Sequence, residues 1–201
     1  MKIACLDFEG VLVPEIWINL SQKTGIEDLR LTTRDIPDYD ELMRYRLGIM
    51  DKHALGFNEL NAAAASLDPL PGAAEFLRWL QARYQVAIIS DTFHQLAGPL
   101  LEKLDYPMVL CHQLVVGADG RITDYQLRQK DPKRHAVKAF QSLNYKVVAT
   151  GDSYNDISML EQADDAMLFR PSDKVRADYP DYPVAETYDE LKTMFANALA
   201  D

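Results

Sequence analysis

Short, continuous apolar runs separated by helical patterns are the feature that most constrains how this chain can fold. The runs cover residues 3–6, 86–89, 108–111, 147–149 and 166–169. Each is apolar throughout rather than alternating, as expected of strands covered on both faces in a parallel sheet. Their alternation with helices predicts an α/β fold, a doubly wound parallel sheet of Rossmann-like type.

Amphipathic stretches fill the intervals between these runs. Helices are predicted over residues 75–83, 92–104, 135–143, 154–162 and 187–199. Two further runs, 114–116 and 121–127, have an alternating pattern and flank the dipeptide Asp119-Gly120. An Asp-Gly pair between two such stretches favours a tight hairpin turn, so we expect a β-hairpin flap here.

Residues 15–69 have a different character from the rest of the chain. They contain amphipathic stretches at 16–23, 39–50 and 59–66 and no convincing strand. We therefore expect a small helical cap at 15–69, inserted after the first strand of an α/β core made of residues 1–14 and 70–201. The length of 201 residues suits one domain with such an insertion better than two full-sized domains.

Charge and composition exclude several function classes. The net charge of −10 disfavours nucleic acid and anionic membranes as partners. Asp7 and Glu9 interrupt the first apolar run too early for a secretory signal, and no run approaches the ~20 residues of a membrane span. Cys5 and Cys111 lie in apolar runs, where buried free thiols are favoured over a disulfide. We expect a cytoplasmic protein.

Polar residues directly follow three of the apolar runs. Since ligands bind beyond the carboxyl ends of strands in open parallel sheets, these residues are expected to meet at one edge. The acidic residues expected to converge are Asp7, Glu9, Asp152 and Asp156. Carboxylates gathered in a small volume repel one another strongly, and a hard divalent cation offsets that repulsion. Ligands that are all oxygen favour Mg²⁺ over zinc.

Each of these residues also has an ordinary structural interpretation. Asp7 and Glu9 suit a solvated turn, and Asp91 suits the N-terminus of the following helix. Ser153 followed by Asp156 fits a capping box. We favour the functional interpretation because three independent strand ends are acidic or hydroxylic together.

The segment Asp131-Pro132-Lys133-Arg134 predicts the start of a helix, with Asp131 at the N-cap and Pro132 at the first helical position. Two cations in the first turn oppose the helix dipole. That penalty is offset if an anion such as phosphate lies against Lys133 and the helix N-terminus. Alternatively both cations point into solvent, and on spacing Lys130 is a rival for the same role.

Together these groups suit phosphoryl transfer. A nucleophilic Asp7 could form an aspartyl-phosphate, which divides a difficult step into two. Lys133, a metal ion and the Ser90 hydroxyl could neutralise the phosphate oxygens. Glu9 could protonate the leaving alkoxide and later take a proton from water.

At these residues the chain resembles the haloacid dehalogenase superfamily over its whole length. The four matching motifs are Asp7-Phe8-Glu9-Gly10-Val11, Ser90-Asp91-Thr92, Lys133 and Gly151-Asp152-Ser153-Tyr154-Asn155-Asp156. Residues 6–17, 33–40 and 125–134 are similar to the phosphoserine phosphatase branch, and most of all to its bifunctional phosphoserine phosphatase/homoserine phosphotransferase type. This resemblance implies a Mg²⁺-dependent phosphomonoesterase that hydrolyses L-phosphoserine through Asp7 and also transfers the phosphoryl group to L-homoserine.

The resemblance also implies a role for each matching residue. Asp7 would be the nucleophile and a metal ligand, Glu9 the general acid/base with its backbone carbonyl on the metal, Asp152 a further metal ligand and Asp156 the residue that orients the metal ligands. Ser90 and Lys133 would hold the phosphate. The residues implied to bind substrate are Glu15, Arg46, Ser90, Asp91, Lys133 and Asn155.

Glu15 and Arg46 are implied to receive the ammonium and the carboxylate of the amino acid. A guanidinium suits a carboxylate because it can bind both oxygens. The ordinary alternatives are a solvated helix face for Arg46 and a first-turn position, favoured by the helix dipole, for Glu15.

Two positions depart from the family pattern. Glu9 stands where most phosphatases of the superfamily have Asp, which adds a methylene at the general acid. We expect a less well aimed hydrolysis that lets an alcohol compete with water. Asp91 stands where phosphoserine phosphatases often have glycine, and it either contacts substrate or caps the next helix.

Three alternatives remain open at this stage. The substrate could be another small phosphomonoester, because the helical insertion sets specificity. The chain could be a receiver-like signalling module with a phosphorylated Asp, or a non-catalytic relative that binds a phosphorylated ligand. Exposed apolar residues on the insertion would suit a homodimer.

Overall fold

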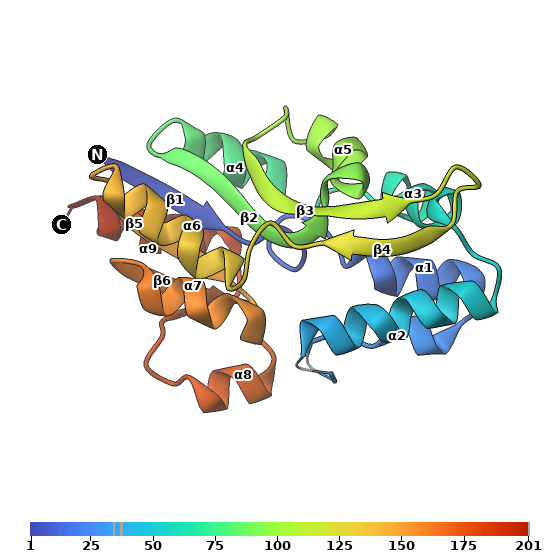
Figure 1. Cartoon of the computed structure of the whole chain (residues 1–201). Coiled ribbons are helices and arrows are strands. Elements are labelled where there is room, and N and C mark those ends of the chain that lie inside the picture. Colours follow the sequence, from blue (N-terminus) through green and yellow to red (C-terminus); the bar gives the residue numbers. More distant parts are fainter. Residues whose placement is uncertain (34, 37, 201) are drawn as a thin grey trace.

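The computed structural model describes residues 1–33, 35–36 and 38–200 and contains one seven-stranded sheet (Figure 1). The sheet order is β4-β3-β2-β1-β5-β6-β7, and the strands are parallel except for β4, which runs antiparallel to β3. The strands are β1 (Lys2–Leu6), β2 (Gln85–Phe93), β3 (Val109–Val116), β4 (Ile122–Gln126), β5 (Lys146–Gly151), β6 (Asp165–Phe169) and β7 (Val184–Ala185). The predicted α/β architecture is confirmed.

Helices cover both faces of this sheet, which explains why the strands are apolar throughout. Successive side chains of a strand point to opposite faces. Ala4 and Leu6 of β1 therefore belong to one core, with α4 (Ala73–Gln81), α5 (His94–Glu102) and α9 (Tyr188–Ala200). Ile3 and Cys5 belong to the other core, with α6 (Pro132–Ser142), α7 (Ile157–Gln162) and α8 (Asp173–Asp178). Cys5 and Cys111 are both free.

The segment between β1 and α4 consists, in its described residues, of helices joined by loops. It contains α1 (Ile16–Thr24), the 3₁₀ helix η1 (Glu27–Arg30), α2 (Tyr39–Lys52) and α3 (Phe57–Ala65). Figure 1 shows these helices beside the β3–β4 hairpin, at the end of the molecule toward which β1 and β2 run. The tip of the hairpin meets the segment directly, because the Phe57 N–H donates to the carbonyl of Gly120 at 2.8 Å. We call residues 15–69 the cap segment.

The strand predicted at 108–111 and the first hairpin strand predicted at 114–116 are one strand, β3. Its first part pairs in parallel with β2, and its second part pairs with β4. The apolar pattern breaks at His112 and Gln113, which is why the sequence suggested two strands. His112 is nonetheless buried.

The predicted start of a helix at residue 92 is also wrong. β2 continues to Phe93, and α5 begins at His94 with no side-chain cap. Asp91 therefore does not cap this helix. The sequence also missed η1, α8 and β7, which are too short to show a periodic pattern. Arg34 and Pro37, part of the segment 33–40 that carried the narrower resemblance, lie outside the described residues.

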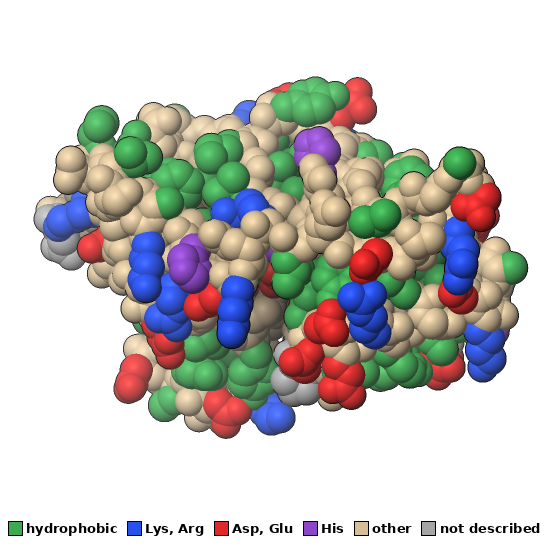
Figure 2. Space-filling view, in the orientation of Figure 1, with side chains coloured by type: hydrophobic (Ala, Val, Ile, Leu, Met, Phe, Trp, Pro, Cys, Tyr) green, Lys and Arg blue, Asp and Glu red, His purple; other side chains and the backbone are tan. Residues whose placement is uncertain are grey.

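The surface carries both signs of charge. Figure 2 shows basic side chains over α6 and acidic side chains over α2 on the same face. Within the described residues, no helix combines the length and the apolar character that a membrane span requires.

Candidate active site

The carboxyl ends of β1, β2 and β5 meet at one edge of the sheet, as predicted. Leu6 at the end of β1 lies between Ile88 of β2 and Thr150 of β5 in the sheet register. The Asp7 N–H continues the pairing by donating to the carbonyl of Thr150 at 3.0 Å. A pocket opens here, lined by Asp7, Glu9, Glu15, Trp17, Thr32, Thr33, Tyr39, Leu42, Arg46, Ser90, Asp91, Thr92, Asp152, Ser153 and Asn155.

Lys133 lies at the centre of the acidic cluster. Its Nζ is 2.9 Å from Asp7 Oδ1, 2.5 Å from Asp156 Oδ1 and 3.6 Å from Asp91 Oδ2. The side chain is 2% exposed, so the solvent-facing alternative is wrong. Burial disfavours the ammonium, but the carboxylates around it outweigh burial and raise the pKa of Lys133 well above its usual value. Lys130, the rival on spacing, is exposed.

The helix that carries Lys133 begins where the sequence predicted. Asp131 is at the N-cap position and Pro132 is the first residue of α6. The Asp131 side chain does not cap the helix, because its oxygens accept from Ser158 Oγ at 2.7 Å and Arg134 Nε at 2.9 Å. Arg134 also reaches Glu161, so of the two first-turn cations only Lys133 faces the site.

Asp156 organises the loop after β5. Its Oδ2 accepts from the N–H groups of Asp152 at 2.9 Å and Ser153 at 3.1 Å, while Oδ1 faces Lys133. The Asp156–Ser153 bond is part of the capping pattern predicted for this loop. Two glycines make room for the carboxylates. A Cβ on Gly10 would lie 2.6 Å from Asp152 Cγ, and one on Gly151 would lie 2.3 Å from Asp156 Cγ.

Three buried carboxylates are placed to hold a cation. Ligand oxygens of Asp7, Asp152 and Asp156 all lie within 4.8 Å of one another. This set consists only of hard oxygen ligands, which fits a divalent cation such as Mg²⁺. Burial and the neighbouring carboxylate of Asp156 raise the pKa of Asp7 well above its usual value, although Lys133 opposes them. A bound cation would favour the ionised form of Asp7.

Glu9 connects the sheet edge to the cap segment. Its Oε2 accepts from the Ile16 N–H at 2.9 Å and so caps α1, whose own N-cap residue, Glu15, makes no side-chain cap bond. Burial, reinforced by the charge of Glu15, raises the pKa of Glu9 to about 8, although Ile16 and Thr92 hydrogen bonds oppose the shift. This shift favours the protonated form of Glu9, which is the form a general acid requires.

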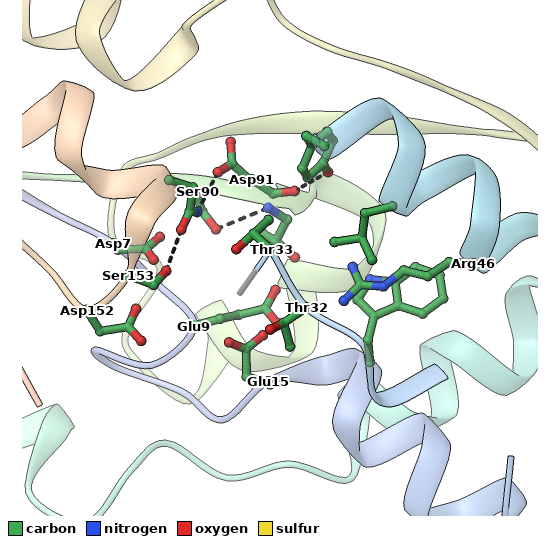
Figure 3. A pocket seen from close by; sticks show the side chains of 15 residues that line it. Asp7, Glu9, Glu15, Thr32, Thr33, Arg46, Ser90, Asp91, Asp152 and Ser153 are labelled. Carbon is green, nitrogen blue, oxygen red and sulfur yellow. Dashed lines mark hydrogen bonds between the residues drawn. The ribbon is translucent and has the colours of Figure 1, made fainter. Parts of the chain in front are cut away.

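Arg46 faces the pocket from α2 and is buried, so the solvated-face alternative is wrong. Its guanidinium lies 4.7 Å from the centre of the Trp17 ring, and one terminal nitrogen donates to the carbonyl of Leu31 at 2.8 Å. The Nε is buried and forms no hydrogen bond within the described residues. Figure 3 shows Glu15 and Arg46 in the same space as Glu9. This side of the pocket therefore offers a cation that is only partly satisfied.

Asp91 also lies close to Lys133, with 3.6 Å between Asp91 Oδ2 and Lys133 Nζ. Its carboxylate is 3.3 Å from His112 Nε2 and accepts from Asn155 Nδ2 at 2.7 Å. Burial alone would raise the pKa of Asp91, but Lys133, His112 and Asn155 outweigh burial and lower it to about 2. Tyr39 from α2 donates to the backbone carbonyl of Asp91 at 2.7 Å. His112 and Tyr39 were not predicted as site residues because nothing in their local sequence separates them from ordinary core residues.

This fold and site define a class of protein. The family model of haloacid dehalogenase-like hydrolases matches residues 1–164. The chain therefore belongs to that family, which excludes the receiver-like alternative.

Two proteins have sequences similar to this chain over nearly its whole length. A Pseudomonas syringae pv. tomato protein named phosphoserine phosphatase is 54% identical over 198 residues, covering 98% of this chain and 84% of the relative. A Pseudomonas aeruginosa protein named phosphoserine phosphatase ThrH is 52% identical over 198 residues, covering 98% of this chain and 97% of the relative.

Solved structures confirm the fold. A phospho-aspartyl intermediate analogue of phosphoserine phosphatase matches with a TM-score of 0.79 at 23% identity, covering 96% of this chain and 98% of that one. A substrate-bound phosphoserine phosphatase complex matches with a TM-score of 0.78 at 22% identity over the same shares of the two chains.

Proposed function

We propose that this protein is a Mg²⁺-dependent phosphoserine phosphatase that can also transfer the phosphoryl group to L-homoserine. The observation that carries the proposal is the Asp7 carboxylate, held 2.9 Å from the buried ammonium of Lys133 in a chain 52% identical over nearly its whole length to phosphoserine phosphatase ThrH. A cytoplasmic location and a homodimer remain predictions from the sequence.

In the proposed reaction Asp7 attacks phosphorus and the bond from phosphorus to the serine oxygen breaks. Glu9 gives its proton to that oxygen, so serine leaves as a neutral alcohol. Water then attacks the aspartyl-phosphate, Glu9 takes the proton of this water, and Asp7 is regenerated with release of phosphate. When bound, Mg²⁺ supplies positive charge that lowers the energy of the transferring phosphoryl group.

Each remaining residue has a proposed part in binding. Lys133 and the buried hydroxyl of Ser90 hold the phosphate oxygens, and Asp152 joins Asp7 and the Glu9 backbone carbonyl in holding the cation. Glu15 receives the substrate ammonium. Arg46 receives the carboxylate, which would satisfy the guanidinium Nε that is buried without a partner among the described residues.

Transfer to an alcohol follows from the length of Glu9. Its carboxylate is already hydrogen-bonded to Ile16, so we propose that water is activated less well than it would be by a shorter Asp. An acceptor hydroxyl then competes for the aspartyl-phosphate. Glu9→Asp should raise the ratio of hydrolysis to transfer, and an unchanged ratio would contradict this explanation.

The test is Mg²⁺-dependent turnover of L-phosphoserine with and without L-homoserine, with serine, phosphate and phosphohomoserine followed together. We expect serine formation that requires Asp7, and homoserine should divert phosphate into phosphohomoserine. Equal amounts of serine and phosphate despite homoserine would leave a simple phosphatase. Turnover of an aryl phosphate through Asp7 but not of phosphoserine would refute the roles of Glu15 and Arg46 and point to another small phosphomonoester.

A further inference from the structure

A directional chain of hydrogen bonds leads from the segment after β4 to the pocket. The Arg128 N–H lies 3.2 Å from Nδ1 of His112, and Nε2 of His112 lies 3.3 Å from Asp91 Oδ1. A backbone N–H can only donate, so Nδ1 must accept. The proton of the neutral ring is therefore on Nε2, from which it donates to Asp91.

The same chain continues through Asp91 to Asn155. Oδ2 of Asp91 accepts from Asn155 Nδ2 at 2.7 Å, and the hydroxyl of Ser153 is hydrogen-bonded to Asn155 Oδ1. A carboxylate only accepts, so the nitrogen of the Asn155 amide must face Asp91. The orientation of the amide thus depends on Asp91, and through Asp91 on His112, which is two side chains away from Asn155.

His112 is well placed to be the anchor of this chain. It is 2% exposed, and its ring packs against Tyr39 and Phe93 with ring centres 6.0 and 6.4 Å apart. The ring cannot turn without breaking both of its hydrogen bonds. The charged group in contact with His112 is the Asp91 carboxylate. Lys133 in turn lies 3.6 Å from Asp91.

We propose that His112 is a positioning residue that, through Asp91, keeps an N–H of Asn155 directed at the phosphate of the substrate. Asn155 lines the same pocket as Asp7 and Ser90. Its amide has two N–H groups; one goes to Asp91, and the other makes no hydrogen bond within the described residues. An amide turned by 180° would instead present its carbonyl oxygen, which repels a phosphate oxygen.

This inference rests on the proposed function, since it assumes a phosphate in the pocket. It also explains why the negatively charged Asp91 lies beside a site for a phosphate, which is itself an anion. Both oxygens of Asp91 are engaged, one by His112 and one by Asn155, and Lys133 lies 3.6 Å away. The charge of Asp91 therefore orients donors around the phosphate rather than meeting the substrate.

The experiment compares His112→Leu with His112→Gln. Leucine removes the donor to Asp91, and we expect the KM for phosphoserine and the Ki of inorganic phosphate to rise together by about 10- to 100-fold, with a smaller fall in kcat. Glutamine places an amide nitrogen near the position of Nε2, so it should keep both constants within about 3-fold of the parent protein.

Gln95→Met is the matched control for stability. Gln95 is also polar and bound to β3, through both the N–H and the carbonyl of Leu114, but among the described residues it forms no hydrogen bond with Asp91 or Asn155. This variant should lower the melting temperature without changing the phosphate Ki. If it raises the Ki as much as His112→Leu does, the effect of His112 is merely structural and the proposal is wrong.

A double-mutant cycle with Asn155→Ala decides whether His112 acts through Asn155. Once the amide is gone, His112→Leu should add less than about 2-fold to the phosphate Ki, whereas independent effects would multiply and overturn the proposal. If His112→Leu does not fold, His112→Asn, whose shorter amide cannot reach Asp91, takes its place. Inorganic phosphate is the probe throughout, so the cycle still gives a result if phosphoserine is not a substrate; that outcome refutes the proposed function alone.

Discussion

The two sides of the pocket are built in different ways. On the sheet side, the buried ammonium of Lys133 lies 2.9 Å from Asp7 Oδ1 and 2.5 Å from Asp156 Oδ1. On the side of the cap segment, Glu15 and Arg46 stand on α1 and α2, and the buried Nε of Arg46 has no partner within the described residues. Figure 3 shows Asp7, Glu15 and Arg46 around the same pocket.

This difference suggests that the sheet side carries out the reaction and that the cap side recognises the substrate. Lys133 binds Asp7 and Asp156 with no substrate present, and the excess of negative charge on this side suits a divalent cation. Arg46 is incompletely satisfied, and a ligand carboxylate would complete it. We therefore expect changes on the sheet side to affect turnover and folding, and changes on the cap side to affect the choice of substrate.

The largest effect is expected for Asp7→Asn. An amide is a poor nucleophile, so turnover of phosphoserine and of a generic aryl phosphate should both fall by about 10⁴-fold or more. The fold should remain, because Asn still accepts from Lys133. Asp68→Asn is the control, since that carboxylate is exposed and pairs with Lys103 on the surface. Residual aryl phosphate turnover near the parent rate would remove Asp7 from the mechanism.

Lys133→Met should affect stability most. It leaves the carboxylates of Asp7, Asp91 and Asp156 without their shared cation, and breaking a buried pair in this way costs about 3–5 kcal/mol. Urea unfolding without divalent metal measures the loss. Arg134→Met, in the same turn of α6 but at the surface, should unfold almost like the parent protein. If Lys133→Met has the same free energy of unfolding as the parent protein, Lys133 does not hold the carboxylates of the sheet side in place.

The sheet side was also the part that the sequence predicted best. Asp7, Ser90 and Asp152 follow apolar runs, and a parallel sheet brings the ends of such runs together whatever the details of packing. The awkward placement of two cations in the first turn of a helix left a phosphate-facing Lys133 as one of two alternatives, and the family resemblance favoured it. In both cases a local pattern carries the three-dimensional information.

The cap side could not be predicted in this way. Whether Arg46 on the amphipathic helix α2 faces solvent or a pocket depends on where α2 lies, and no local pattern fixes that. His112 breaks an apolar run, so the sequence divided β3 in two, although the histidine is buried by contacts with Tyr39, Asp91 and Arg128. Both residues owe their environment to partners that are distant in the chain.

Arg46→Met tests recognition separately from chemistry. The KM for phosphoserine should rise by about 10- to 100-fold because a charged hydrogen bond is lost. An aryl phosphate has no carboxylate for Arg46, so its kcat/KM should stay within about 3-fold of the parent value. Arg46→Lys keeps the positive charge but not the planar guanidinium. Its KM for phosphoserine should therefore lie between those of the parent protein and of Arg46→Met. Equal losses for both substrates would place Arg46 in the chemistry.

The pH dependence of kcat/KM tests whether Glu15 in the cap segment shifts the pKa of Glu9. Glu9 must be protonated to act as an acid, and burial together with Glu15 raises its pKa to about 8. The kcat/KM should therefore fall about tenfold per pH unit above about pH 8. Glu15→Gln removes a like charge, so the pKa of Glu9 should drop and the falling limb should move to lower pH. If the falling limb of the pH profile does not move, the charge of Glu15 has no electrostatic effect on the pKa of Glu9.

The smallest effect is expected where the cap segment meets the hairpin. Arg121 at the hairpin binds Asp51 in α2 through two hydrogen bonds of 2.7 and 2.5 Å, but both side chains are largely exposed. Water and salt screen such a pair, so Arg121→Ala should lower the melting temperature by no more than about 2 °C, and by less at high salt. Gly56→Ala is the comparison, because its Cβ would lie 2.8 Å from the carbonyl oxygen of Gly120 and would push the two segments apart. A larger loss for Arg121→Ala than for Gly56→Ala would mean that charge, rather than backbone contact, holds the hairpin against the cap segment.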